Sequence, residues 1–337
     1  MNISMVLVLL VALAVSAAIL LVVVALVWWV DRYDREPIHL VAMVFLWGAS
    51  AAPLTAIFAY PIFVRVLHTI EAPGDLGLIG IGLVTPFLEE ITKAAGVLLV
   101  VVFSNKFDNP TDGVVYGTAS GLGFAVTENV VYGIGGGAGA ETSLGILILV
   151  GGRTLLSAGV HAICSATFGG FIGYATLCGR RLSKAAWILG GLILATAIHG
   201  AWNMSLVRFG PVGEGGGPKP WLAALGVLYL AYPIALALFL SSEHRILKRE
   251  LAIEVELETV PGWVLDVIPY YRKRVRGNWW PSRNERTVIS RLLTRMAFRK
   301  HALRRLPPGD AAIASLEVVR LRQRLREIFD PEEPEAT

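Results

Sequence analysis

Long apolar stretches dominate the first 240 residues of this chain. Seven of them reach the length of about 20 residues that an α-helix needs to cross a bilayer. They cover residues 3–30, 38–67, 76–103, 113–134, 143–178, 185–207 and 221–240. With 55% hydrophobic residues and a mean hydropathy of +0.61, the 337-residue chain is more apolar than a soluble protein. The sequence therefore predicts an all-α fold, a polytopic membrane helix bundle of about seven transmembrane helices.

The last hundred residues have a different composition. Residues 242–337 hold 19 of the 30 Lys and Arg residues, and the stretches 287–306 and 311–329 place apolar residues at helical spacing. We expect a transmembrane domain at 1–241 and a small, basic, helical cytosolic appendage at 242–337, with a disordered end from 330 onward. A basic surface beside a membrane attracts anionic lipid. The appendage contains no motif for reading nucleic acid, which argues against a nucleic-acid partner.

The basic residues also predict the orientation. Alternate connections carry Arg32 and Arg35, then Lys106, then the basic turn at 180–184, then the cluster at 245–249, whereas the opposite connections carry few. Because basic residues gather on the cytoplasmic side, the N-terminus is expected outside and the C-terminus in the cytoplasm of a cell-membrane protein. The glycine tract at 135–139 is expected to be a flexible loop on the outer side.

Ionisable side chains interrupt four of the apolar stretches at a similar depth. Two adjacent glutamates and a lysine lie about 20 Å into the third stretch, and a further glutamate lies about 22 Å into the fourth. The fifth and sixth stretches each carry a histidine near the centre. The residues are Glu89, Glu90, Lys93, Glu128, His161 and His199, with Asn203 one turn beyond the last histidine. Because such groups are costly in lipid, they are expected to face the bundle interior and meet in one polar site.

Each of these side chains also has a structural explanation. Glu89 and Lys93 have the i,i+4 spacing of a helix ion pair, although that pair leaves Glu90, about 100° away on the helix, unexplained. Glu128 alone can serve a polar contact between helices, and a lone histidine is most simply a hydrogen-bonded packing residue. It is the clustering of desolvated ionisable groups that indicates a functional site.

Three motifs, in this order, resemble those of the PrsW intramembrane proteases. The sequence EEITK at 89–93 resembles their EExxK motif, and FAVTE at 124–128 is similar to their FxxxE motif. HGAWN at 199–203 resembles the HxxxN element that is shared with the CAAX-type prenyl proteases. The likeness covers about residues 31–206 and leaves the C-terminal appendage unmatched.

The resemblance implies hydrolysis of a peptide bond within or beside the membrane. The implied substrate is a single-span membrane protein such as an anti-sigma factor. Glu89 is then expected to be the base that takes a proton from water, with Glu128 or His161 helping to hold that water. His199 and the amide of Asn203 are expected to donate hydrogen bonds to the developing oxyanion.

Two mechanisms stay open. Glu89, Glu128, His161 and His199 are suitable ligands for Zn²⁺ with an open position for water, although the chain has no His-Glu-x-x-His helix. The alternative is a metal-free glutamate mechanism, in which Lys93 keeps one glutamate ionised or holds its helix in place. No other cofactor is indicated.

Two further functional classes compete with a protease. A proton-coupled membrane transporter would also place carboxylates and histidines at the midplane, but the chain shows neither an inverted repeat nor paired interrupted helices. A sensor or scaffold would act through its basic appendage and keep the polar cluster for structure. Replacement of Glu89 by Gln separates the classes, because only a protease loses turnover while it keeps its fold and its partner.

Overall fold

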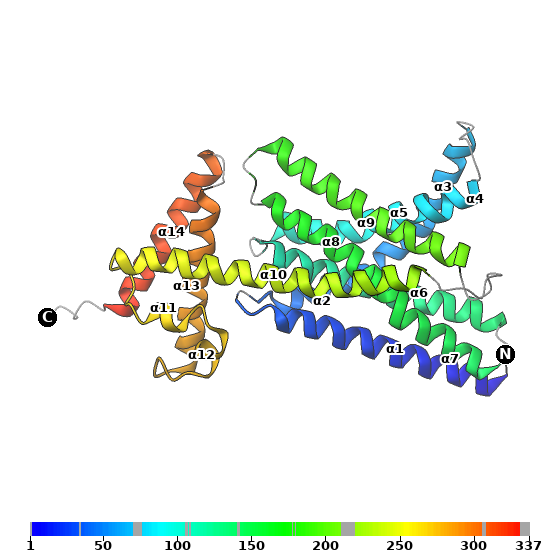
Figure 1. Ribbon diagram of the computed structural model, residues 1–337, viewed down its shortest axis with the longest axis horizontal. Helices are drawn as coiled ribbons and strands as arrows, with labels where there is room; N and C mark the ends of the chain where they lie inside the picture. Colours follow the sequence, from blue (N-terminus) through cyan, green and yellow to red (C-terminus); the bar gives the residue numbers. More distant parts are fainter. Residues whose placement is uncertain are drawn as a thin grey trace. The chain divides into compact units, whose positions relative to one another are not determined.

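The computed structural model describes residues 2–33, 35–69, 76–104, 107, 109–139, 142–176, 178, 180–209, 220–304 and 308–330. The described residues form helices and connections without a strand. They divide into two compact units (Figure 1). The first unit comprises Met1–Val30, Glu36–Thr176 and Ala185–Leu236, and the second comprises Asp31–Arg35, Leu177–Lys184 and Ala237–Thr337.

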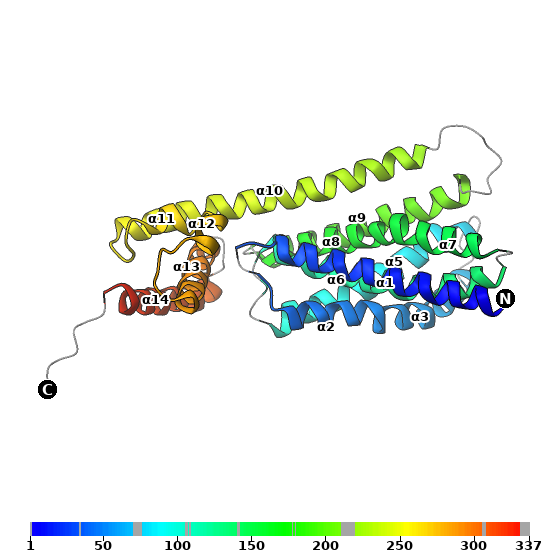
Figure 2. The same ribbon diagram turned by 90° about the horizontal axis from the view of Figure 1, so that it is seen from below.

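The first unit is a bundle whose long helices run roughly alongside one another (Figures 1 and 2). Its helices are α1 (Ile3–Val30), α2 (Ile38–Ala49), α3 (Ala51–Thr69), α4 (Leu76–Ile79), α5 (Thr85–Phe103), α6 (Pro110–Gly139), α7 (Ser143–Gly152), α8 (Ala158–Thr176), α9 (Arg181–Phe209) and the first part of α10 (Pro220–Glu256). Two five-residue π-helical segments join these elements: η1 (Gly80–Val84) leads from α4 into α5, and η2 (Arg153–Ser157) leads from α7 into α8.

Five helical stretches of the described chain are long and apolar enough to cross a membrane. They are Ile3–Val30, Ile38–Val66, Ser143–Thr176, Arg181–Arg208 and Leu222–Glu256. These helices confirm the all-helical membrane fold, whereas a total of seven spans stays a prediction. Two of the seven predicted stretches are not among these five helices. They lie on α5, which carries three charged residues, and on α6, which is rich in glycine. Helices that contact other helices rather than lipid do not need a continuous apolar surface, because polar groups can face the bundle interior.

Helix α6 lies at the centre of the first unit. It packs against α1, α2, α5, α7 and α8, and its residues 111–125 are all buried. A stripe of glycines on α6 lets its backbone approach that of α8. A Cβ atom on Gly117 would lie 2.2 Å from the carbonyl oxygen of Ser165, and one on Gly121 would lie 2.3 Å from that of His161. This close approach, typical of small residues in membrane helix pairs, places His161 beside α6.

Replacement of Gly117 by Ala is expected to lower the free energy of unfolding by about 1–3 kcal/mol, because the added methyl group forces two packed backbones apart. The matched control is Gly135→Ala on the same helix, where an added Cβ meets no atom within 4 Å. That control should be neutral or slightly stabilising, since alanine is the better helix former. Thermal unfolding of the purified proteins in one detergent compares them. Equal stability of the two variants would contradict the proposed role of the glycine stripe.

Two expectations about the helices need correction. Residues 135–139 were expected to form a loop, and this was wrong, because α6 continues to Gly139. A glycine costs a helix about 1 kcal/mol relative to alanine, but a continuous helix keeps its backbone groups hydrogen-bonded where water is absent. The stretch 38–67 is divided into α2 and α3 at Ser50, whose φ of −127° and ψ of −70° depart from helical values.

The second unit confirms a helical C-terminal region. It contains the last part of α10, α11 (Val264–Val267), α12 (Tyr271–Arg276), α13 (Arg283–Leu303) and α14 (Pro308–Phe329). Residues such as Leu251, Ile268 and Leu293 form its own hydrophobic core. The disordered end that the sequence predicts at 330–337 lies, beyond Asp330, outside the described residues.

Candidate active site

Helix α5 directs Glu90 and Lys93 into the bundle interior. Lys93 Nζ donates a hydrogen bond of 2.5 Å to Glu90 Oε1, and the two side chains are 0% and 1% exposed. The i,i+4 pair of Glu89 with Lys93, considered as the structural alternative, is not formed among the described residues, because the lysine pairs with Glu90 one turn away at i,i+3. Ser165 Oγ of α8 also donates to Glu90 at 3.4 Å. Of the two adjacent glutamates, Glu90 is therefore the one whose carboxylate oxygens both accept hydrogen bonds.

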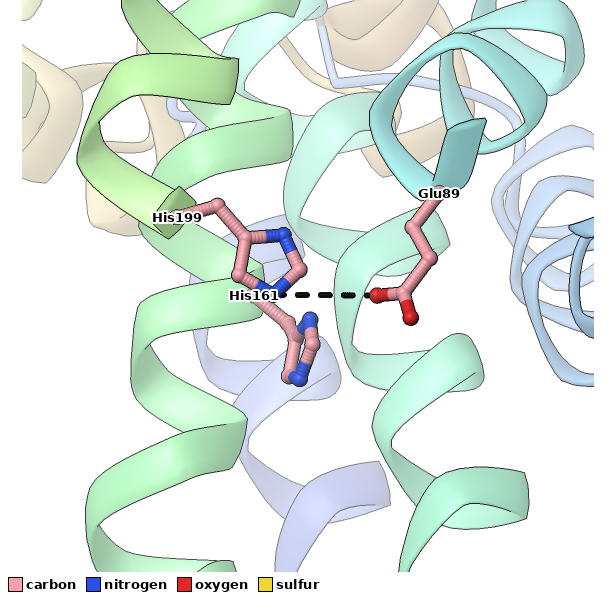
Figure 3. Close-up of side chains that lie close together, drawn as sticks. All are labelled: Glu89, His161 and His199. Atoms are coloured by element: carbon pink, nitrogen blue, oxygen red, sulfur yellow. Dashed lines mark ion pairs between the residues drawn. The ribbon is translucent and has the colours of Figure 1, made fainter. Parts of the chain in front are cut away.

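His199 of α9 lies between the two adjacent glutamates. Its Nδ1 is 2.8 Å from Glu90 Oε1, and its Nε2 is 3.7 Å from Glu89 Oε2 (Figure 3). Because the Glu90 carboxylate accepts a hydrogen bond, Nδ1 carries a proton, and Glu90 fixes both the orientation of the ring and the direction of Nε2. Glu89 Oε2 is buried and accepts no hydrogen bond from any described residue.

His161 of α8 connects Lys93 with Glu128 of α6. Its Nδ1 is 3.1 Å from Lys93 Nζ, and its Nε2 is 2.5 Å from Glu128 Oε2. Since an ammonium group only donates, Nδ1 accepts from Lys93, and the protonated Nε2 faces Glu128 Oε2 in a close polar contact. The rings of His161 and His199 meet edge to face with their centroids 4.8 Å apart (Figure 3). His161, which packing alone could have explained, thus lies within the cluster.

Phe124 forms one wall of this cluster. Lys93 Nζ lies 4.6 Å from the centroid of its ring, and the imidazole of His161 lies 5.4 Å from it. An ammonium over an aromatic face is stabilised by the ring quadrupole, most strongly where water is excluded. Phe124 is therefore more than a packing residue, because it supports the cation that holds Glu90.

Arg153 is a site residue that the sequence interpretation missed. It lies in η2, and its Nη2 is 2.9 Å from Glu128 Oε2. Its Nε donates to Asn129 Oδ1 at 3.2 Å, and its guanidinium lies 3.8 Å from the centroid of the Tyr132 ring. The signal was available, because an arginine within an apolar stretch is itself an indicator of a functional site.

Asn203 lies one turn after His199 on α9, at the edge of the site. Its Nδ2 donates to the carbonyl oxygen of Ile81 at 3.3 Å. That carbonyl belongs to η1, the π-helical segment that precedes the glutamate motif, just as η2 precedes His161. Widened turns of this kind are frequent at functional sites, since they change the direction of the helix that follows.

Two cavities meet at Glu89 and Glu128. A polar cavity of about 400 Å³ is lined by both glutamates together with Arg153, His161 and Asn203. An apolar cavity of about 350 Å³ extends from the same glutamates along α3, where its walls are Pro53, Ala56, Ile57 and Tyr60. Thr85 and Tyr132 also line both cavities. The arrangement places two carboxylates where an apolar chain segment and water can meet.

The residues of the cluster are suitable for a divalent metal ion. One ligand atom each of Glu89, His161 and His199 lies within 4.8 Å of the others. Nitrogen and carboxylate ligands of this kind are those of catalytic zinc sites. Metal-binding histidines usually donate their other ring N–H to a carboxylate or a carbonyl, as His199 does to Glu90. Glu89 Oε2, which accepts no hydrogen bond from the described residues and lies 3.7 Å from His199 Nε2, provides an anionic ligand on the same side.

Comparisons with known proteins identify the family. A family described as "PrsW family intramembrane metalloprotease" matches residues 36–238, more than half of the chain. The protease PrsW of Bacillus subtilis (strain 168) is 28% identical over 184 residues, which cover 52% of this chain and 73% of that protein. The protease PrsW of Geobacillus kaustophilus (strain HTA426) is 27% identical over 178 residues, with coverages of 52% and 71%.

A third relative, the protease PrsW of Shouchella clausii (strain KSM-K16), is 28% identical over 186 residues, 53% of this chain and 76% of that protein. No solved structure matches the chain. The matched range of residues 36–238 contains all of the glutamates and histidines of the cluster described above. The chain therefore belongs to the PrsW family of intramembrane metalloproteases.

Proposed function

We propose that this protein hydrolyses a peptide bond of a membrane-anchored protein and that Glu89 activates the attacking water. The observation that carries the proposal is the position of Glu89, which lines both the apolar and the polar cavity and whose Oε2 has no hydrogen-bond partner among the described residues. A base must reach both its water and the scissile carbonyl, and this position serves both.

The chemistry follows from the groups around that position. Glu89 accepts a proton from a water molecule in the polar cavity, and the water oxygen forms a bond to the scissile carbonyl carbon. The carbonyl oxygen becomes an oxyanion, for which the second N–H of the Asn203 amide and a protonated Nε2 of His199 are the donors. The proton on Glu89 then passes to the amide nitrogen as the carbon–nitrogen bond breaks, which leaves a carboxylic acid and an amine.

The remaining polar groups of the cluster orient the side chains of His199 and Glu128. Lys93 and Glu90 fix His199 through the hydrogen bond at Nδ1, so that Nε2 faces Glu89. Arg153 and His161 both contact Glu128 Oε2, which orients that carboxylate at the edge of the polar cavity. Held in this way, Glu128 can accept a hydrogen bond from the same water through its other oxygen.

The family description as a metalloprotease leads us to propose a zinc ion in this cluster. In that arrangement Glu89, His161 and His199 would hold the ion through unprotonated ring nitrogens and a carboxylate oxygen, in place of the base and oxyanion-donor roles given above, with Glu128 next to His161. A bound Zn²⁺ supplies Lewis acidity that makes water more acidic and polarises a carbonyl. Zinc analysis of the purified protein, set beside that of a His199→Ala variant, tests this assignment, and equal metal content in both would contradict it.

The proposed substrate is a single-span membrane protein, and the resemblance in the motifs implies an anti-sigma factor. The apolar walls of the cavity along α3 suit the hydrophobic residues that flank a cleavage site near the end of a membrane span. Attraction of the basic C-terminal region to anionic lipid would keep that region at the same membrane surface.

We propose the orientation that the basic residues predict, with the N-terminus outside and the C-terminus in the cytoplasm. Reporter domains fused after Ser104 and after Arg180 are expected to report the cytoplasm. A reporter within residues 135–139 is expected to report the outside. An outside signal after Arg180 would contradict the proposed number of spans.

Reconstitution of the purified full-length protein with a fluorescently tagged single-span protein tests the activity. The expected result is two product fragments, whose new termini, located by mass spectrometry, lie within or beside the span. A pH-sensitive dye inside the same vesicles reports proton movement. Cleavage without proton flux supports a protease, whereas proton flux without cleavage would overturn the proposal in favour of a transporter.

A further inference from the structure

Helix α10 packs only lightly against the bundle of the first unit. Of the residues in its most apolar stretch 11% are buried, compared with 50% for Ser143–Thr176. Two tyrosine hydroxyl groups of α10 nevertheless make hydrogen bonds to the bundle. Tyr232 pairs with the hydroxyl group of Thr118 on α6 at 2.7 Å, and Tyr229 binds the backbone of η2. Tyr229 therefore links a lightly packed helix to a segment that carries Arg153, a residue of the candidate active site.

The hydroxyl group of Tyr229 contacts the backbone of the turn where η2 passes into α8. It donates to the carbonyl oxygen of Leu155 at 2.7 Å and shares this proton with that of Leu156 at 3.0 Å. It also makes a hydrogen bond with the backbone of Gly159. In a regular α-helix the N–H of Gly159 bonds to the carbonyl oxygen of Leu155, four residues earlier. The hydroxyl group thus contacts both of these backbone groups at the place where the helical pattern changes.

Gly159 makes this close approach possible. A Cβ atom at this position would lie 1.7 Å from the hydroxyl oxygen of Tyr229 and 2.2 Å from the ring carbon that carries it. Both distances lie well below the 3.0 Å that real Cβ atoms keep from other heavy atoms. Any residue with a side chain at position 159 would therefore displace the tyrosine, and the glycine of α8 and the hydroxyl group of α10 form one contact.

The turn that Tyr229 contacts lies between the two residues that fix Glu128. Arg153 is two positions before Leu155, and His161 is two positions after Gly159. Both side chains approach the same oxygen, Glu128 Oε2, at 2.9 Å and 2.5 Å. Eight residues of regular α-helix span about 12 Å along the axis. That two side chains so far apart meet at one atom depends on the geometry of the widened turn between them, and such turns are frequent at functional sites.

We propose that Tyr229 is a positioning residue for peptide hydrolysis. Its hydroxyl group holds the turn between η2 and α8 in the geometry that brings Arg153 and His161 to Glu128. This role rests on the proposed function, in which Glu128 accepts a hydrogen bond from the attacking water. Neither cavity of the site has Tyr229 among its described lining residues. The tyrosine therefore acts through other residues and does not touch the substrate.

A purely structural role is the alternative, in which Tyr229 only attaches α10 to the bundle. Tyr232 provides the comparison, because it lies three residues further along the same helix and bonds to Thr118, which is not among the described lining residues of either cavity. Loss of either hydroxyl group leaves a polar group of the bundle without this partner, at a comparable cost in stability. Only the contact of Tyr229 reaches the segment between Arg153 and His161, so only its loss should change catalysis.

Steady-state cleavage of a tagged single-span protein by the full-length enzyme tests the proposal. Tyr229→Phe removes only the hydroxyl group and is expected to lower kcat by about ten-fold, the order of effect of one lost orienting hydrogen bond. KM should stay nearly constant, because no described residue of η2, α8 or α10 lines the apolar cavity along α3. Tyr232→Phe should leave kcat and KM unchanged. An equal loss of kcat in both variants, or a change in KM alone, would overturn the proposal.

Gly159→Ala tests the same contact from the side of α8. Its added Cβ collides with the hydroxyl group of Tyr229. The variant is therefore expected to lose kcat to a similar extent, although alanine is the better helix former. Combined with Tyr229→Phe it should cause little further loss, because the effects of two residues in one contact do not add. Losses that multiply in the double variant would contradict a shared contact.

Hydrogen–deuterium exchange separates failure of this proposal from failure of the proposed function. Exchange in peptides that cover residues 153–161 should be faster in Tyr229→Phe than in the unaltered protein, and unchanged in Tyr232→Phe. If the unaltered protein cleaves its substrate but the two variants behave alike in kcat and exchange, Tyr229 positions nothing and this proposal alone is wrong. If the unaltered protein cleaves no single-span protein, the proposed function is wrong and the catalytic role of Tyr229 is wrong with it.

Discussion

Replacement of Glu89 by Gln is expected to reduce peptide hydrolysis by about 10³-fold, within the range of about 10²–10⁴ that positioned acid–base groups contribute. Glutamine keeps the shape of the side chain but cannot take a proton from water. Because Glu89 Oε2 accepts no hydrogen bond from the described residues, the substitution removes no hydrogen bond at that atom. The fold should therefore survive, and the loss should appear in turnover rather than in the amount of folded protein.

The matched control for this prediction is Glu327→Gln in α14, an exposed glutamate outside the polar cluster. Cleavage of a tagged single-span substrate, thermal unfolding in detergent and zinc content are measured on both variants. A Glu89→Gln protein that loses activity but keeps its metal would identify the residue as a base, whereas joint loss of metal and activity would identify it as a ligand. Turnover within a few-fold of the unaltered protein would contradict both roles and direct attention to Glu128.

Replacement of Lys93 by Met is expected to lower the free energy of unfolding by about 3–5 kcal/mol, the cost of removing one partner of a buried ion pair. Lys93 is 0% exposed and Glu90 is 1% exposed, so that water cannot replace the ammonium group beside the carboxylate. The lysine also donates to His161 and lies over the ring of Phe124. Its loss should therefore disturb three helices at once.

A double variant separates stability from catalysis at this position. Lys93→Met together with Glu90→Gln removes both charges and is expected to regain part of the lost stability, since an uncharged pair is cheaper to bury. Activity should stay low in the double variant, because Glu90 no longer orients His199 through Nδ1. Unfolding curves and cleavage rates of the two single variants and the double variant test this. Full stability of Lys93→Met would show that the pair serves the reaction alone.

Hydrophobic length and the depth of ionisable residues were sufficient to predict much of this protein. The apolar stretches predicted helices that the structure contains, and the equal depth of Glu89, Glu128, His161 and His199 predicted the cluster in which they lie. Both inferences work because a bilayer imposes two rules on any chain: backbone groups must be bonded within a helix, and charged groups must find partners inside the bundle. The motifs at 89–93, 124–128 and 199–203 also indicated the correct family.

Other features were decided only by the packing of helices against one another. Spacing along α5 allows Lys93 to pair with either glutamate, and the histidines of α8 and α9 determine that it pairs with Glu90. Arg153 reaches Glu128 only because η2 packs against α6. Spacing along a single helix limits which neighbours a side chain can reach. Burial then favours the arrangement that pairs each charge, because an unpaired charge costs far more free energy in the interior than in water.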